Sequence, residues 1–179
     1  EGDDLELEVA GLDLGEIEDV VDDGEEGLAG LADGVYGVAL VLGELGEDER
    51  RTVDETVREV LELKLGLSPD RVRPHLLAVF SDPDRDPRGW TISIAHAVAQ
   101  PASALTDVVG ELAPLDVDGR LASGERLLYD HDEIIASATD NLRERYEDRP
   151  DPDGLLPEPY TLSDLRELHE AVLGRRLMR

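Results

Sequence analysis

Residues 75–100 read HLLAVFSDPDRDPRGWTISIAHAVAQ, two apolar runs separated by ten loop-forming residues. The runs at 75–80 and 91–100 have the length and the apolar content of β-strands. The intervening segment, 81–90, contains two prolines and Gly89, which favour a tight and rigid connection. This stretch therefore predicts two strands joined by a stiff loop that carries a cluster of charged side chains.

A helix is predicted over residues 52–66. Thr52 and Glu55 have the spacing of a capping box, in which each side chain accepts a hydrogen bond from the backbone amide of the other residue. Gly66 supplies the stop. The apolar stripe between these ends consists of Val53, Val57, Val60 and Leu61.

Similar patterns assign the remaining elements. Residues 1–34 are predicted to be loop or weak helix, apart from a short strand indicated by the alternation of Leu5, Leu7 and Val9. Strands that alternate with helices predict an α/β layered domain followed by a helical appendage. The other expected elements are a buried strand at 34–45, a strand or turn ending at 127–129, a helix from a cap at Asp130 and Glu133 to about residue 146, and a last helix from Thr161 to Gly174 after a linker rich in Pro and Asp.

The chain is strongly acidic, with 17 Lys+Arg against 44 Asp+Glu and a formal net charge of -27 over 179 residues. Lys64 is the only lysine. A carboxylate-rich and lysine-poor surface suits a cytoplasm near multimolar salt, where charge repulsion is screened over about 3 Å. We therefore expect a halophilic protein, with an ordinary acidic protein as the alternative.

No stretch approaches the roughly 18 apolar residues of a membrane span, and no basic start followed by an apolar run marks a secretory signal. The absence of cysteine excludes disulfides and thiolate metal sites. We expect a cytoplasmic protein with no membrane partner.

The acidic charge is unevenly distributed. Residues 1–56 carry 20 acids and 2 arginines, a net charge of -18, whereas residues 141–179 carry 9 acids and 7 arginines, a net charge of -2. An acidic balance disfavours nucleic acid at ordinary salt, because polyanion binding depends on Lys and Arg. We expect any anion to bind at the nearly neutral C-terminal end. Its candidate DNA-contacting residues are Arg175, Arg176 and Arg179, and the alternative is that they favour a helix C-terminus.

Three glutamates of the predicted helix, Glu55, Glu59 and Glu62, are spaced four and three residues apart and project from one face. A row of carboxylates can bind Mg²⁺ and, through it, a diphosphate. The alternative is a solvated face in a chain in which a quarter of the residues are acidic.

This helix resembles the Nudix box, whose pattern ends in Arg-Glu-U-X-Glu-Glu-X-Gly-U, with U an apolar residue. Leu63 stands where the box has its next Glu, and Lys64 with Leu65 puts one extra residue before Gly66 and Leu67. Aligned from the glycine end instead, the box glutamates fall on residues that cannot bind a metal. Either register loses at least one carboxylate. The residues that match the start of the pattern are Arg58, Glu59, Val60, Leu61 and Glu62.

Two longer motifs carry a more specific resemblance. Residues 79–98, VFSDPDRDPRGWTISIAHAV, are similar to a segment of ADP-ribose-related Nudix proteins that reads FGDPxRDPRGRxISVAY. Residues 127–146 and 155–177 resemble the segment that leads into the winged helix of the NrtR family, the Nudix-related transcriptional regulators of NAD metabolism. The matching residues there are Asp130, His131, Ile134, Leu142, Arg143, Leu155, Leu156, Pro157, Tyr160, Thr161, Leu162, Leu165, Glu170, Leu173 and Gly174.

The resemblance spans about residues 52–179. It implies a Nudix-like α/β/α sandwich at 1–147, whose first 50 residues match poorly, a linker at 148–160, and the start of a C-terminal winged-helix segment at 161–179. It also implies binding of ADP-ribose or a related nucleotide, DNA binding through the C-terminal segment, and a homodimer.

The loop 81–90 holds the candidate nucleotide-binding residues. Arg85 and Arg88 suit a diphosphate because one guanidinium can pair two oxygens at once. Trp90 has a ring that can stack on an adenine, and the alternative is burial in the core. The alternative for the two arginines is an ion pair that locks the loop, with Asp82, Asp84 or Asp86.

Two histidines have chemical alternatives. His96 lies on a predicted strand face with apolar neighbours and is assigned to the core in preference to a ligand. His131, beside two aspartates at a helix start, is assigned to the helix cap, with a metal site as the alternative.

These patterns leave three functions open. The first is a catalytically impaired Nudix-like sensor of ADP-ribose or a related NAD-derived nucleotide, acting in transcriptional regulation and requiring no cofactor. The second is an active Nudix hydrolase of ADP-ribose or another nucleoside diphosphate derivative, with Glu59 and Glu62 as Mg²⁺ ligands. The third is a dimeric remnant that binds neither nucleotide nor DNA.

Overall fold

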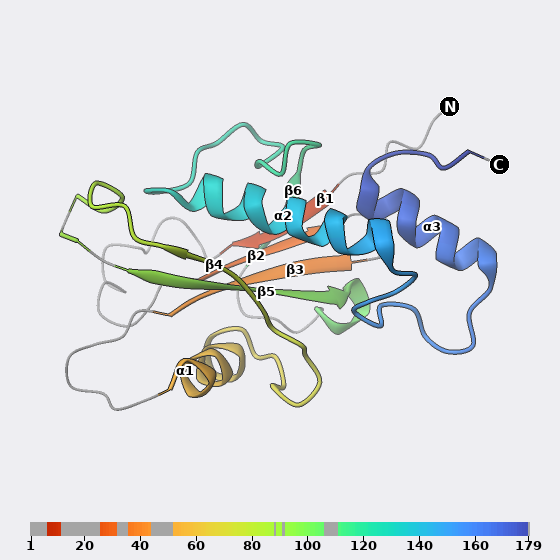
Figure 1. The fold of residues 1–179 in the computed structure, drawn as a ribbon, viewed down its shortest axis with the longest axis horizontal. Helices are drawn as coiled ribbons and strands as arrows, with labels where there is room; N and C mark the ends of the chain where they lie inside the picture. The colour runs from red at the N-terminus through yellow and green to blue at the C-terminus, as the bar shows by residue number, and fades with distance from the viewer. Residues whose placement is uncertain are drawn as a thin grey trace.

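The computed structural model describes residues 7–11, 26–31, 36–43, 52–87, 89–90, 92–105 and 111–178. These residues form one sheet with helices on both faces (Figure 1). The strands are β1 (Leu7–Gly11), β2 (Glu26–Leu31), β3 (Tyr36–Gly43), β4 (His75–Phe80), β5 (Ser93–Pro101) and β6 (Glu111–Leu115). The helices are α1 (Val53–Glu59), which continues as the π-helical turn η2 (Val60–Lys64), the short 3-10 helix η3 (Ala102–Ala104), α2 (His131–Asp148) and α3 (Leu162–Leu173).

The strand order of the sheet is β1-β6-β2-β3-β5-β4, so that β4 forms one edge. Neighbouring strands run antiparallel except β6 and β2, which run parallel. β4 pairs with β5 from Phe80 opposite Ser93 to His75 opposite Ala97, with one register shift between them. The stretch 75–100 therefore forms the two neighbouring strands that its sequence predicts.

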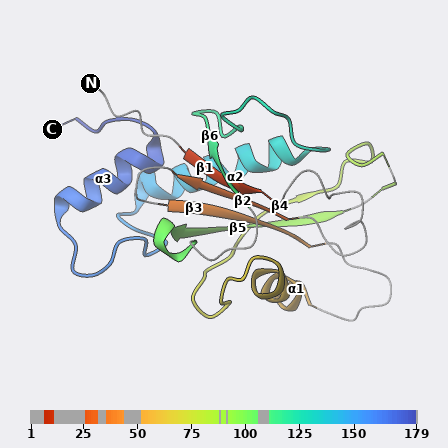
Figure 2. The same ribbon diagram turned by 180° about the vertical axis from the view of Figure 1, so that it is seen from behind.

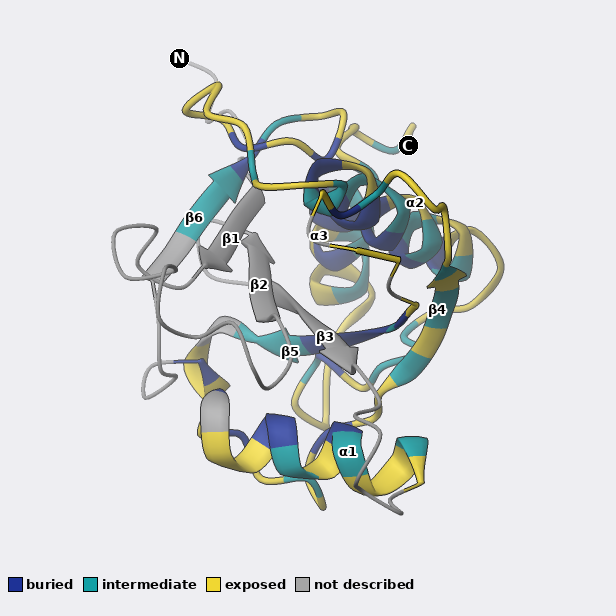
Figure 3. Cartoon of the chain, turned by 90° about the vertical axis from the view of Figure 1, so that its left-hand side faces the viewer, coloured by how far each residue is buried: buried dark blue, intermediate teal, exposed yellow. Residues whose placement is uncertain are grey.

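Helices cover both faces of the sheet. α1 and η2 lie against one face and α2 against the other, as Figure 3 shows end-on and Figure 2 shows from behind. Because successive strand residues point to opposite faces, β5 supplies Val98 to the core under α1 and its small residues to the core under α2. The predicted α/β/α sandwich is confirmed. The β5 residues under α2 are Ala95, Ala97 and Ala99.

The C-terminal helix α3 packs beside α2. The helix begins after Thr161 and ends at Gly174, as the sequence predicts, and Thr161 forms a capping box with Asp164. The buried face of α3 belongs to the same core as α2 and the sheet, so the appendage is not separated from the sandwich by solvent. The shared core residues of the two helices are Ile134, Ile135, Ala138, Leu142, Tyr146, Leu168, Ala171 and Val172.

Some local predictions are wrong. β2, EGLAGL, falls where a loop or weak helix is predicted, and the strand β6, ELAPL, is not predicted at all. Both sequences lack a run of β-branched residues, and both strands form by pairing with neighbours on the sheet. The segment 127–129 forms a turn, one of the two expected alternatives. Within the described residues, no helix is long and apolar enough to cross a membrane.

Candidate functional site

Arg85 occupies the centre of the loop between β4 and β5. Its Nε donates to Asp130 Oδ2 at 2.7 Å and its Nη2 to Asp130 Oδ1 at 2.9 Å. Its Nη1 donates to Ser93 Oγ at 2.8 Å. The Arg85 side chain is 5% exposed and that of Asp130 15% exposed. The guanidinium therefore joins the loop to the start of α2 and to β5.

The predicted helix cap by the Asp130 side chain is wrong. The residue stands at the N-cap of α2, but its side chain makes no cap hydrogen bond, because the carboxylate serves Arg85 instead. The ion pair that locks the loop thus reaches a residue 45 positions away, beyond the local aspartates considered from the sequence. The role of Arg85 as a diphosphate ligand stays a prediction.

The rest of the loop is held by turn contacts. The backbone amide of Asp84 donates to Asp82 Oδ1 at 2.8 Å, and that of Arg85 to the Asp82 carbonyl at 3.2 Å. The Trp90 indole Nε1 donates to the Ser81 carbonyl at 3.1 Å. Trp90 is 68% exposed, so burial in the core does not occur and its ring is accessible for stacking. Arg88 lies outside the described residues.

The helix that resembles the box begins as predicted. Glu55 Oε2 accepts hydrogen bonds from the Thr52 amide at 2.7 Å and from Thr52 Oγ1 at 2.9 Å. Glu55 is therefore engaged in the capping box, while Glu62 is exposed on the following turn. Among the side chains that the structure describes, no three His, Cys, Asp or Glu lie close enough to hold a metal ion. These residues do not by themselves fit an Mg²⁺ site, and the metal role of Glu55, Glu59 and Glu62 stays a prediction.

The extra residue in the box has a structural counterpart. The amide of Leu65 donates to the carbonyl of Val60 at 3.2 Å, a bond across five residues instead of four. A π-helical turn of this kind accommodates one inserted residue in an α-helix. The turn therefore ends before Gly66, which follows the helix with a φ of 67°, and Leu63 within the turn is 69% exposed.

The two candidate histidines lie in different surroundings. His96 on β5 is 8% exposed, and within the described structure its buried Nδ1 has no hydrogen-bond partner. Burial lowers the pKa of His96, against smaller opposing effects of the Ile94 backbone and the Asp54 charge. The core assignment is confirmed. His131 Nδ1 lies 2.6 Å from the Leu128 carbonyl in the turn that precedes α2.

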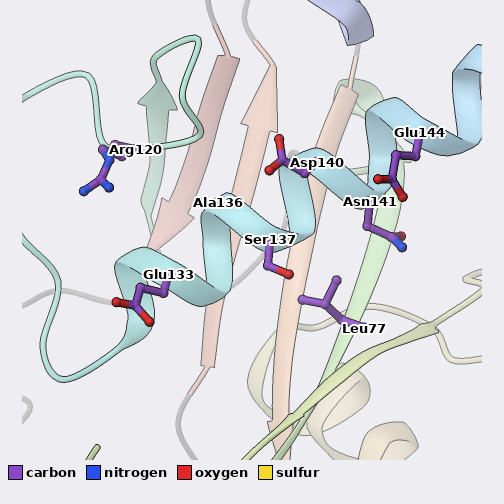
Figure 4. A pocket seen from close by; sticks show the side chains of 8 residues that line it. All are labelled: Leu77, Arg120, Glu133, Ala136, Ser137, Asp140, Asn141 and Glu144. Atoms are coloured by element: carbon purple, nitrogen blue, oxygen red, sulfur yellow. The ribbon is translucent and has the colours of Figure 1, made fainter.

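The structure has a groove between α2 and β4 that the sequence did not predict. It has a volume of about 440 Å³, and its lining places Leu77 of β4 beside one face of α2 (Figure 4). Arg120 lies at one side, and the helix contributes carboxylates at intervals that follow its periodicity. Such a lining does not favour a diphosphate. The acidic lining residues are Glu133, Asp140 and Glu144.

The C-terminal arginines are partly described. Arg175 and Arg176 are exposed just after α3, and Arg179 lies outside the described residues. Exposure leaves the two described guanidiniums accessible to an anion.

The sheet with the helix 53–64 on one face and α2 on the other is the α/β/α arrangement that the resemblance to Nudix proteins implies. No protein-family model matches the sequence, and no curated protein does. Among solved structures, the chain is similar to NrtR of Shewanella oneidensis, with a TM-score of 0.57 and 20% identity over 97% of this chain and 72% of that chain.

Two further structures agree with this fold. NrtR of Shewanella oneidensis complexed with a 27mer DNA has a TM-score of 0.54 and 21% identity, over 87% of this chain and 72% of that one. A MutT/nudix family protein from Enterococcus faecalis has a TM-score of 0.50 and 19% identity, over 78% and 68% of the two chains. The resemblance to Nudix and NrtR proteins is thereby confirmed at the level of the fold.

Proposed function

We propose that this protein is a Nudix-like sensor of ADP-ribose or a related NAD-derived nucleotide, impaired in hydrolysis, that acts in transcriptional regulation. The observation that carries the proposal is the helix 53–64. This helix resembles the box in sequence and lies against one face of the sheet, yet an exposed Leu63 stands in place of a box glutamate and a π-helical turn absorbs an extra residue. Loss of carboxylates removes the charge that would neutralise a leaving diphosphate through a metal ion.

The loop 81–90 supports nucleotide binding without hydrolysis. The Arg85 side chain ties this loop to Asp130 and Ser93, and the exposed Trp90 ring is anchored at its nitrogen, so a stacking face is available with little loss of conformational freedom. Arg85 and Arg88 are the candidate residues for the diphosphate. Together these groups suit a nucleoside diphosphate, through stacking on the base and pairing with the phosphates.

Calorimetric titration with ADP-ribose in multimolar KCl, with and without Mg²⁺, followed by product analysis, tests this proposal. We expect binding without cleavage. Trp90 is the only tryptophan, so stacking should also quench its fluorescence. Trp90→Ala should weaken binding by roughly tenfold, and Val117→Ala, at another exposed apolar residue, should not.

The alternative is an active Mg²⁺-dependent hydrolase with Glu59 and Glu62 as metal ligands. Release of AMP only in the presence of Mg²⁺ would favour it. In that case Glu59→Gln should abolish turnover while binding persists. Unchanged turnover in this variant would remove Glu59 from the site.

DNA binding is the second part of the proposal. Arg175 and Arg176 are exposed at the end of α3, and the structure of NrtR complexed with a 27mer DNA supports a regulator of this fold. Repeated selection from random duplexes should enrich a binding sequence. Replacing both arginines with Gln should then lower the salt dependence of binding by about one counterion for each. A homodimer and a cytoplasmic location belong to the same proposal.

A further inference from the structure

Residues 149–161 connect α2 to α3, cover nearly all of the predicted linker 148–160 and are called the linker from here on. The linker is fastened to the sandwich through Asp153. This carboxylate is 2% exposed, and its Oδ1 accepts a hydrogen bond from Arg145 Nη1 of α2. The same oxygen lies 3.0 Å from His75 Nε2 at the start of β4. One atom of the linker therefore joins the helix and the edge strand of the sheet.

A second carboxylate of the linker shapes its turn. Asp151 accepts hydrogen bonds from the amides of Leu155 at 2.9 Å and Leu156 at 3.0 Å. It also accepts from the hydroxyl of Tyr146, a fully buried residue of α2, at 3.1 Å. These hydrogen bonds give the linker a defined conformation. A solvent-exposed linker rich in Pro and Asp would not make such contacts with the rest of the chain.

α3 is attached to the same group of residues. His169 Nε2 contacts the Pro150 carbonyl of the linker, and its ring packs edge-on against Tyr146, with 5.5 Å between ring centroids. Arg143 of α2 donates to the Val172 carbonyl at 3.4 Å. The orientation of α3 is therefore set jointly by α2 and by the fixed linker.

The burial of Asp153 is costly, which points to a role in orientation. Its Oδ2 and the Nε of Arg145 are buried and, among the described residues, have no hydrogen-bond partner. A buried ion pair with unsatisfied atoms contributes little net stability, because desolvation offsets the attraction, but it favours one geometry over others. We propose that Asp153 is a positioning residue that latches the linker to β4 and α2 and so fixes the orientation of α3 relative to the sandwich.

The functional meaning of this latch rests on the proposed function. β4 and α2 run in opposite directions. Asp153 joins the start of β4 to the last turns of α2, and the Arg85–Asp130 ion pair joins the loop after β4 to the start of α2. The same two elements thereby hold the candidate nucleotide loop at one end and the linker at the other. Asp153 keeps α3 and its following arginines in a constant position relative to the loop 81–90.

Hydrogen–deuterium exchange of the full chain in multimolar KCl tests the latch. Asp153→Asn removes the charge with little change in shape, and Asp148→Asn, at the exposed last residue of α2, is the matched control. We expect exchange in 149–161 to accelerate by roughly tenfold or more in Asp153→Asn only, with β5 unchanged. His75→Leu removes the β4 contact alone, should accelerate exchange less, and serves if Asp153→Asn does not fold.

A distance measurement tests the orientation of α3. The chain has no cysteine, so spin labels at Val79→Cys on β4 and Glu167→Cys on α3, both at exposed positions, report a single pair. The distance distribution should broaden or shift in Asp153→Asn and stay narrow in Asp148→Asn.

Unchanged exchange in Asp153→Asn and His75→Leu would overturn the latch. Faster exchange with an unchanged distance distribution would overturn its role in orienting α3. A wild-type protein that binds neither ADP-ribose nor DNA defeats the proposed function, whereas these two measurements still decide the role of Asp153.

Discussion

Arg85 and Asp130 form a two-point ion pair between the β4–β5 loop and the start of α2, with N–O distances of 2.7 and 2.9 Å. Both side chains are largely buried. A planar guanidinium that meets a carboxylate at two atoms fixes direction as well as distance. The pair therefore couples the position of the candidate nucleotide loop to that of a core helix.

Asp130→Asn should destabilise the protein by roughly 3 kcal/mol, because it removes the negative charge that a buried guanidinium contacts at two atoms. Asp84→Asn, at an exposed residue of the same loop, should change the free energy of unfolding by less than about 0.5 kcal/mol. Denaturant unfolding in multimolar KCl measures both. Equal effects in the two variants would show that Arg85 is satisfied without Asp130.

The sequence signals that succeed are local ones. The capping boxes at Thr52 and Thr161 depend on residues three positions apart, and both are present in the structure. Asp130, which pairs with Arg85, is 45 residues away in the sequence. Its place at the start of a helix predicted a helix cap instead of this ion pair. Sequence distance hides such pairs, because only the antiparallel arrangement of β4 and α2 brings their ends together.

The same limit explains the missed parts of the fold and site. β6 contains Pro114 and β2 contains two glycines, residues that disfavour strands unless neighbouring strands hold them. The carboxylate of Asp153 reads as part of a solvated linker, whereas the fold buries it between His75 and Arg145. The alternation of Pro and Asp in the sequence indicates that the backbone conformation is restricted, but it does not indicate which residues the aspartate side chains contact.

Repair of the box tests whether its sequence defects explain the proposed loss of hydrolysis. Leu63→Glu combined with deletion of Lys64 restores the pattern Arg-Glu-U-X-Glu-Glu-X-Gly-U. Leu63 is 69% exposed, and the deletion removes the residue that the π-helical turn accommodates, so the fold should persist. We expect the combined variant to release AMP from ADP-ribose in Mg²⁺, and each single change to do so far less. A folded, repaired variant without turnover would place the defect elsewhere.

His96 should make the fold sensitive to mild acid. Burial lowers its pKa in the folded state below its ordinary value of 6.5, so the unfolded chain takes up a proton first as the pH falls. The stability contribution is complete above pH 6.5 and is lost between 6.5 and the lower folded pKa, with a slope of at most about 1.4 kcal/mol per pH unit. His96→Leu should remove this component. Parallel stability curves for wild type and variant over this range would contradict the prediction.

The net charge of -27 should make stability depend on salt. Repulsion among carboxylates disfavours the compact state, and multimolar KCl screens it over about 3 Å. The melting temperature should rise steeply from low to multimolar KCl. A melting temperature that is indifferent to salt would remove the halophilic interpretation.

Alanine substitutions at Gly119 and Gly124 distinguish the cost of backbone strain from the cost of a steric clash. Both have positive φ, 72° and 78°, so alanine at either position incurs a similar conformational cost. A Cβ at Gly119 would lie 2.9 Å from Thr139 Oγ1 and 3.1 Å from the Ala136 backbone of α2, whereas one at Gly124 would meet nothing within 4 Å. Gly119→Ala should therefore destabilise the protein by roughly 1 to 3 kcal/mol more than Gly124→Ala in denaturant unfolding. Equal losses would mean that the loop before α2 can move away from the helix at no cost.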